Sequence, residues 1–370
     1  MGKAAGLKTD WEGTFGAFCY AVRPDPMLVR SRYLELFMQS PRYRKRVSQL
    51  AAGTNINNLK RDHIESFELP RLDLGEQDSV VAAADKQLTR LDVADGSVEA
   101  AQRKLRTQRR AILHAAVTGR LNERSAEPSA RITEILELRE QEAAASRVGN
   151  AKYRPPTPPV GSLDVPPEWT VAALEQATSA SRPICYGILK PRIQGEGTVP
   201  YVEVRDLRQG RIRGDLKRTS SDLDEEFKRS RLASGDVVIA IRGSYDRGAV
   251  VPDFLVGANI SRDVARIVPL HILHPSFLSL YLQSPMAHRH FGLIARGSAV
   301  KGLNIGDLRS MPVPVPPFSE QLAIVDETER LLSLADDLAI QIEGARRRTE
   351  NLRQSILHSA FSNRPVGVSV

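Results

Sequence analysis

Basic side chains are concentrated in two short stretches whose residue types and spacing suit contact with a polyanion. The first, "RDLRQGRIRGDLKR" (residues 205 to 218), contains only two acids among its bases, which are Arg205, Arg208, Arg211, Arg213, Lys217 and Arg218. The second, "IRGSYDRG" (residues 241 to 248), places Arg242 and Arg247 around Ser244 and Tyr245. Arginine can contact a phosphate or a guanine edge with two hydrogen bonds, and glycine allows close backbone approach. Taken alone, such a loop is more commonly a solvated turn.

The motifs of several enzyme classes are missing from the sequence. It contains no GxxxxGK loop, no HExxH and no GxSxG, and "GEG" (residues 195 to 197) lacks the rest of a dinucleotide fingerprint. The pattern nearest to a nuclease site is "VEVRD" (residues 202 to 206), for which Glu196 is the only nearby second acid. His288 and His290 are predicted to be surface residues, and His114 and His358 to belong to long helices. These absences argue against a nucleotide hydrolase, a zincin and a serine hydrolase.

Length, composition and charge narrow the class of protein. The 370 residues suffice for two or three domains, and 41% hydrophobic with 26% charged residues is ordinary for a globular protein. We find no apolar run of about 18 residues and no signal-peptide pattern, so a cytoplasmic protein is expected. The two cysteines are far apart, which argues against disulfides and zinc sites. A net charge of +8 favours a polyanionic partner, although excess positive charge also serves solubility.

An internal repeat relates two distant parts of the chain. "GEQ" (residues 75 to 77) and "SEQ" (residues 319 to 321) lie 244 residues apart, and the same offset pairs "QSP" with "QSP" and "ILH" with "ILH". Over residues 39 to 120 the two copies share 22 identities in 82 positions, roughly a quarter, where unrelated sequences give about one in fifteen. We infer a duplication in which residue 1 corresponds to about residue 245, so that the first copy begins in its middle.

Each copy ends in one long predicted helix. Before the second helix, "SMPVPVPPF" (residues 310 to 318) can only be extended or polyproline-like, because its prolines disfavour helix. Ser319 suits an N-cap and Glu320 the first helical turn. Apolar residues at coiled-coil spacing predict a helix-to-helix seam, formed by Leu88, Leu91, Val98, Leu105, Ile112, Leu331, Leu338, Ile342, Leu352 and Ile356. Two matched helices in one chain favour an intramolecular antiparallel pair over a homodimeric coiled coil.

The remaining segments are a linker and a mixed helix and strand region. A shorter helix is predicted over residues 129 to 147, followed by the proline-rich linker "YRPPTPPVGSLDVPPEW" (residues 153 to 169). Strands are predicted at "VPYVEV" (199 to 204), "GDVVIAI" (235 to 241) and "GAVVP" (248 to 252), with helices at residues 275 to 284 and 30 to 40. Residues 169 to 316 are therefore predicted to form one α/β domain.

Several of these pieces, taken in order, resemble the specificity subunit of type I restriction-modification systems. They are "PEWTVAALEQ" (167 to 176), "VPYVEVRDLRQGRI" (199 to 212), "GDVVIAIRGSYDRGAVV" (235 to 251), "GANIS" (257 to 261) and "GLNIGDLRSMPVPVPPFSEQLAIV" (302 to 325). The resemblance covers nearly the whole chain. It implies an α+β protein in which tandem target-recognition α/β domains are joined by two long antiparallel coiled-coil helices.

The resemblance also implies a function and a set of partners. Such a subunit is non-catalytic and reads a bipartite target in double-stranded DNA, with one half-site for each recognition domain. The paired helices would set the gap between half-sites and dock two modification (methyltransferase) subunits, with restriction subunits in the complete complex. S-adenosylmethionine, ATP and Mg would act in those partner chains, and no cofactor is expected in this one. No membrane partner is expected.

On this resemblance the chain divides into six parts. They are a partial first recognition domain (1 to 72), the first spacer helix (73 to 120), a short helix and linker (121 to 165), a complete second recognition domain (166 to 316), the second spacer helix (317 to 362) and a tail (363 to 370). The first domain lacks a counterpart of about residues 166 to 244. We expect either a start codon further upstream or a truncation that impairs the first half-site reader.

The second recognition domain is the expected DNA-binding part. Its predicted contacts are Arg205, Arg208, Arg211, Arg213, Lys217, Arg218, Arg242, Ser244, Tyr245, Arg247 and Asn259, with Lys301 and Asn304 reaching the DNA backbone. The sequence leaves two alternatives open. The chain could be a defective subunit that binds a methyltransferase without reading a complete target, or a coiled-coil scaffold that binds no DNA.

Overall fold

The computed structural model consists of two compact units. Unit 1 comprises Met1–Leu105 and Asp337–Val370, and unit 2 comprises Arg106–Asp336. The structure describes the whole chain except residues 1, 8–11, 17–18, 52–58, 147–153, 190–196, 244–246, 295–301, 363–365 and 370. Each of the two long helices contributes residues to both units, so the units do not coincide with the domains expected from the sequence.

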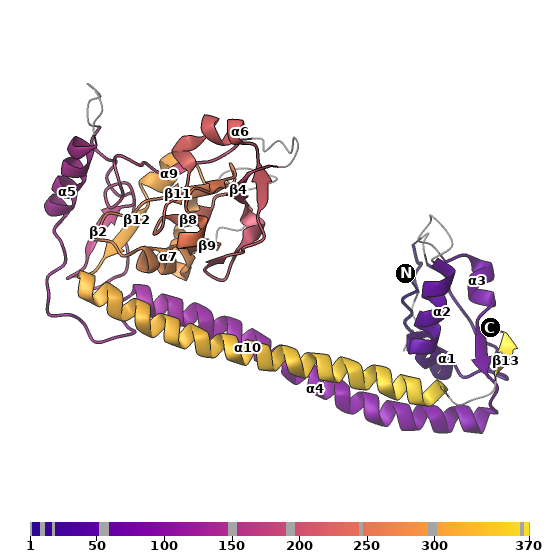
Figure 1. The fold of residues 1–370 in the computed structure, drawn as a ribbon. Coiled ribbons are helices and arrows are strands. Elements are labelled where there is room, and N and C mark those ends of the chain that lie inside the picture. Colours follow the sequence, from indigo (N-terminus) through magenta and orange to yellow (C-terminus); the bar gives the residue numbers. More distant parts are fainter. Residues whose placement is uncertain are drawn as a thin grey trace. The chain divides into compact units, whose positions relative to one another are not determined.

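Unit 2 is built around a four-stranded sheet in the order β3-β11-β8-β9, of which Figure 1 labels β11, β8 and β9. Its strands are antiparallel neighbours and comprise β3 (Cys185–Tyr186), β11 (Val264–Ile267), β8 (Val237–Ala240) and β9 (Gly248–Val250). Every residue of β8 is buried, as its unbroken apolar run indicates. The helix α7 (Pro275–Gln283) packs against β8 and β9.

Smaller elements complete unit 2. A three-stranded sheet has the order β10-β4-β7, from β10 (Asn259–Ile260), β4 (Val199–Val202) and β7 (Lys217–Thr219). Two further pairs are β12 (Pro312–Val315) with β2 (Thr170–Ala173), and β5 (Leu207–Arg208) with β6 (Arg211–Ile212). The helices are α5 (Ile132–Ala145), α6 (Ser221–Glu226), α8 (Pro285–Ile294) and α9 (Ile305–Arg309), with 3-10 turns η1 (Val204–Asp206), η2 (Lys228–Ser230) and η3 (Asp253–Leu255).

Unit 1 is mainly helical. It contains α1 (Ser31–Gln39), α2 (Pro41–Ala51) and α3 (Arg61–Glu65), and its strand β1 (Glu68–Pro70) pairs antiparallel with β13 (Val366–Ser369). Aromatic rings form the centre of its core: Phe361 lies 5.3 Å from Tyr33 and 5.5 Å from Phe37, measured between ring centroids. The last turn of the second long helix therefore belongs to the core of unit 1.

The two long helices are α4 (Leu74–Val117) and α10 (Phe318–Phe361), and they pair antiparallel within the chain (Figure 1). In unit 1, Arg353 contacts Asp92 while Thr349 contacts Asp95; in unit 2, the Asn122 side chain, beyond the end of α4, bonds the Ala323 carbonyl. The predicted α+β class with two long antiparallel helices is confirmed. In the described part of the chain, no helix is both long and apolar enough to cross a membrane.

The helix seam follows the predicted residues only in part. Leu88, Leu105 and Ile342 are buried, and Leu91, Val98, Ile112, Leu331 and Ile356 are half-buried. Leu338 and Leu352 are 43% and 54% exposed, so their predicted place in the seam is wrong. A strict heptad drifts by about 20° per repeat on a straight α-helix, which carries this leucine row out of the seam. Ala335 is buried together with the predicted Ile342.

The internal repeat predicted from the sequence is also present in the secondary structure. An offset of 244 residues takes α1 to α7, α3 to α9 and α4 to α10 with both ends in register. It also takes the start of α2 to that of α8, and the start of β1 to that of β12. Each copy therefore folds into the same series of helix, helix, short helix, strand and long helix.

Each copy contains a buried glutamine that makes the same three hydrogen bonds. The Oε1 atom of Gln77 accepts the Arg30 N–H, and its Nε2 donates to the carbonyls of Leu28 and Leu72. Gln321 makes the three corresponding bonds, to the His274 N–H and to the carbonyls of Ile272 and Pro316. Through these hydrogen bonds, the glutamine of the repeated Glu-Gln pair connects the start of each long helix to the segments before it.

The start of α10 differs from the prediction in one respect. The helix begins at Phe318, and the Ser319 hydroxyl donates to the Glu127 carboxylate at 2.6 Å instead of capping the helix. Glu320 does lie in the first turn, as predicted, but it is buried and accepts a hydrogen bond from the Trp169 indole at 3.2 Å. The glutamate is therefore a packed residue in unit 2 as well as a charge near the helix N-terminus.

Candidate nucleic-acid interface

The arginine-rich stretch folds into a tight hairpin. Gln209 and Gly210, with φ of 50° and 76°, form the two-residue turn between β5 and β6, and both angles match the left-handed conformation that such turns require. In this register Leu207 faces Ile212, and both are buried in the core of unit 2. Because side chains alternate along a strand, the next pair faces outward. Arg208 and Arg211 are therefore exposed and directly opposite each other.

The hairpin arginines differ from their neighbours in how their charge is balanced. Arg205 lies 2.9 Å from the Glu203 carboxylate, and Lys217 lies 3.2 Å from the same group. For Arg208, Arg211 and Arg213 the structure has no ion pair with any described acid. Two like charges directly opposite on a hairpin destabilise it unless an anion lies between or above them. Within the described part of the chain, the hairpin arginines thus have no acidic partner at ion-pair distance.

The other predicted basic residues of unit 2 make local contacts. Arg218 is exposed and donates to the Thr198 carbonyl at 2.6 Å, and the half-buried Arg247 donates to the Val204 carbonyl at 3.3 Å. Asn304 is exposed, and its side-chain oxygen caps α9 by accepting the Gly306 N–H at 3.2 Å. Ser244, Tyr245 and Lys301 lie outside the described residues.

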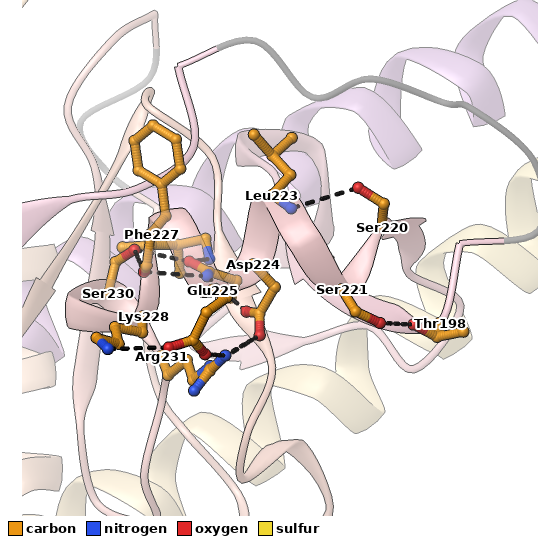
Figure 2. A network of polar contacts seen from close by, with 12 residues as sticks. Thr198, Ser220, Ser221, Leu223, Asp224, Glu225, Phe227, Lys228, Ser230 and Arg231 are labelled. Carbon is orange, nitrogen blue, oxygen red and sulfur yellow. Dashed lines mark hydrogen bonds and ion pairs between the residues drawn. The ribbon is translucent and has the colours of Figure 1, made fainter.

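Asn259 does not belong with the exposed set. The residue is fully buried beside α6 and η2. Its Nδ2 donates to Asp224 at 2.8 Å, and its Oδ1 accepts the Ser230 hydroxyl at 2.7 Å. Figure 2 labels two of these partners, Asp224 and Ser230, and shows that Arg231 binds both Asp224 and Glu225. The prediction that Asn259 contacts DNA is therefore wrong, because both ends of its amide already have partners inside the protein.

A recess beside the hairpin contains residues that the sequence patterns missed. It has a volume of about 540 Å³ and is lined by Ile188, Leu189, Glu203, Val204, Arg205, Ser261, Arg262 and Asp263. Asp263 lies between Arg262, at 3.6 Å, and the predicted Arg242, at 3.5 Å. Arg262 and Asp263 follow the "GANIS" piece directly, and no periodicity distinguishes them from an ordinary turn before β11.

The acidic residues around η1 are structural. Burial raises the pKa of Asp206, whose carboxylate accepts the Glu203 N–H at 2.8 Å and so closes the turn. Glu203 is held by Lys217 and Arg205. Glu196, the second acid that a nuclease site would need, lies outside the described residues. These contacts account for the "VEVRD" segment as a turn that positions the hairpin.

Comparison with known proteins gives consistent results. The family model described as "Type I restriction modification DNA specificity domain" matches residues 187–343. Two curated Escherichia coli proteins, the EcoBI and EcoKI type I restriction enzyme specificity subunits, are 29% and 27% identical over 95% and 98% of this chain, and each alignment covers 71% of the relative. A solved structure from work on complex assembly and conformational transition of a type I R-M system has a TM-score of 0.61 over 92% of this chain and 73% of that chain. At 18% identity, that similarity concerns the fold.

Proposed function

The chain belongs to the family of type I restriction-modification specificity subunits, and on this premise we propose that it reads a bipartite sequence in double-stranded DNA for a methyltransferase complex. Members of this family are generally non-catalytic, so the chain would recognise DNA and leave the chemistry to other subunits. Unit 2 would read one half-site.

The observation that carries the proposal is the β5-β6 hairpin. Arg208 and Arg211 face each other on its exposed side, and Arg213 follows directly, without an ion pair to any described acid. DNA phosphates would relieve the repulsion between the two guanidinium groups, and a guanine edge offers each of them a bidentate contact. A two-stranded ribbon is also narrow enough to enter a major groove.

Partner docking would use the long helices. Leu338 and Leu352 lie two heptads apart on α10 and are exposed, although they were expected in the seam. Exposed leucines at this spacing suit a partner helix or an apolar groove. We propose that this face of α10 contributes to binding the modification subunits, while the paired helices set the gap between half-sites. S-adenosylmethionine, ATP and Mg would act in the modification and restriction subunits, and the complex would work in the cytoplasm.

Reconstitution tests the DNA-reading role. The chain is co-expressed with its modification subunits, and the methylated motif is determined by sequencing plasmid DNA from those cells. We expect Arg211→Ala with Arg213→Ala to abolish or change one half of the motif. The matched control is Arg124→Ala with Arg131→Ala, which removes two exposed arginines from unit 2 outside the hairpin and the recess. An unchanged motif and unchanged methylation in the hairpin variant would show that the hairpin does not read DNA.

Salt dependence separates the remaining alternatives. Affinity for duplex DNA should fall steeply with ionic strength, with a slope that decreases by about one for each phosphate contact removed. A wild-type complex that binds no duplex at low salt would instead be a coiled-coil scaffold. Purification together with methyltransferase, but without any methylated motif, would identify a defective subunit.

A further inference from the structure

Asp263 is one of two acids that line the recess, where Arg205 and Arg262 also lie. It lies in the turn between β10 and β11, and its backbone carbonyl accepts the Ile241 N–H at 2.9 Å, which fixes the turn beside β8. Arg242 and Arg262, which flank its side chain, are 55% and 48% exposed. A carboxylate here weakens attraction to phosphates, so simple backbone binding does not explain it.

The carboxylate of Asp263 keeps unused capacity to accept hydrogen bonds. Its Oδ1 atom is buried beside the two arginine Nε atoms, at 3.5 and 3.6 Å, and has no hydrogen bond among the described residues, so an outside donor would meet the exposed part of the carboxylate. The side chain as a whole is 35% exposed and lines the recess. Glu203, the other acid of the recess, differs because Lys217 and Arg205 bind it at 3.2 and 2.9 Å.

These contacts indicate which chemical group the Asp263 carboxylate would bind. An acceptor held in place by two positive charges, but not bonded, favours a ligand that brings a hydrogen-bond donor. In the major groove both cytosine N4 and adenine N6 are donors, but adenine N6 lies beside the N7 acceptor, which a carboxylate disfavours, so cytosine N4 is the donor that suits Asp and Glu, while arginine pairs with guanine or phosphate. An acid also disfavours guanine O6 and thymine O4 at the same position, because they are acceptors.

We propose that Asp263 is a specificity-determining residue that accepts a hydrogen bond from the exocyclic amino group of one cytosine in the half-site read by unit 2. Arg242 and Arg262 hold the carboxylate and contact the neighbouring guanine or phosphate. The proposal rests on the DNA-reading function given above and extends it to the identity of one base.

The test uses the full chain in complex with its modification subunits and duplexes that carry its methylated motif. Each cytosine of the motif is replaced in turn by N4-methylcytosine, whose methyl group occupies the major-groove position of the amino proton. With the wild-type complex, one replacement should lower affinity roughly tenfold or more, the discrimination expected for a base contact. With Asp263→Ala, that same replacement should have no effect, while affinity for unrelated duplex stays equal or rises because a negative charge is removed.

The controls keep the outcomes distinct. Glu226→Ala removes an exposed acid of unit 2 outside the recess and should retain the wild-type response. If Asp263→Ala does not fold, Asp263→Asn of nearly equal size takes its place and should weaken the response. Asp263 is not the reader if no cytosine is sensitive to the methyl group, or if the variants keep the wild-type sensitivity. A wild-type complex without any sequence preference would instead overturn the proposed function.

Discussion

The two copies of the repeat share a frame but differ in the contacts made around it. In both, a buried glutamine at the start of a long helix makes the same three hydrogen bonds, through Gln77 in unit 1 and Gln321 in unit 2. The surroundings of this frame differ, because the glutamate before Gln321 is buried whereas the glutamate before Gln77 is exposed. The strand before each long helix also has a different partner, which is β13 for β1 in unit 1 and β2 for β12 in unit 2.

The largest effect is expected from removing the shared glutamine. Gln321→Ala leaves the His274 N–H and the Ile272 and Pro316 carbonyls without their buried partner, which should destabilise this part of unit 2 by about 3 kcal/mol. Hydrogen exchange measured by mass spectrometry should show faster exchange at the start of α7 and at the start of α10. Gln341→Ala, an exposed glutamine on the same helix, is the matched control.

The same substitution in unit 1 tests whether the two glutamines act independently. Gln77→Ala should increase exchange at the start of α1 and leave the start of α7 unchanged, because its three partners all lie in unit 1. If each substitution disturbed both units equally, the two glutamines would not be independent parts of two similar frames.

A second prediction concerns the strands that pair with the repeated strand. In unit 2, β12 pairs with β2, and in unit 1 its counterpart β1 pairs with β13. Truncation after Ser362 removes β13 and should destabilise β1 locally by about 2 kcal/mol, because backbone groups of a three-residue strand lose their partners. Exchange in β12 should not change. Val368→Pro, which removes one N–H from β13, should give a smaller effect, and unchanged β1 exchange in both variants would argue against the pairing.

The frame was predictable from the sequence, whereas the candidate site was predictable only in part. Periodicity and proline positions determined the long helices, which begin at Leu74 and Phe318, because those signals are local. The outward direction of Arg208 and Arg211 needed the register of the hairpin. Arg262 and Asp263 enter the recess only through pairing between strands distant in sequence, and the burial of Asn259 depends on α6 and η2.

A third prediction uses the glutamate that precedes each shared glutamine. Glu320 is buried and accepts the Trp169 indole N–H, so Glu320→Ala should destabilise unit 2 by about 2 kcal/mol. Glu76 is exposed and exchanges hydrogen bonds with Asp73 at the start of α4, so Glu76→Ala should cost about 0.5 to 1 kcal/mol in unit 1. Urea unfolding monitored by tryptophan fluorescence measures the stability lost in Glu320→Ala. Hydrogen exchange of the α4 amides measures the stability lost in Glu76→Ala.

The control for this pair is Glu320→Gln, which keeps an acceptor for the indole and removes the charge. It should recover most of the stability lost in Glu320→Ala. Equal losses in the alanine and glutamine variants would mean that the charge near the helix N-terminus matters more than the bond to Trp169.

The smallest effect is expected at two ion pairs that the repeat relates. Arg353 contacts Asp92 at 2.6 Å and Asp95 at 2.9 Å in unit 1, while its counterpart Arg109 contacts Asp336, the counterpart of Asp92, in unit 2. Both pairs are partly exposed, so Arg353→Ala and Arg109→Ala should each cost about 0.5 to 1 kcal/mol, and less in high salt.

The pH dependence of local stability should differ between the Arg353→Ala and Arg109→Ala variants. A hydrogen bond from the Thr349 hydroxyl, together with Arg353, holds the pKa of Asp95 below its usual value of 3.8. A carboxylate with a lowered pKa in the folded state contributes stability above pH 3.8, and that contribution is lost as pH falls through the lowered pKa. Exchange of the adjoining α4 and α10 amides between pH 5 and pH 2.5, corrected for intrinsic rates, should therefore depend less on pH in Arg353→Ala than in wild type. Arg109→Ala should keep the wild-type dependence in unit 1, and the same flattening in both variants would show that Asp95 is not its source.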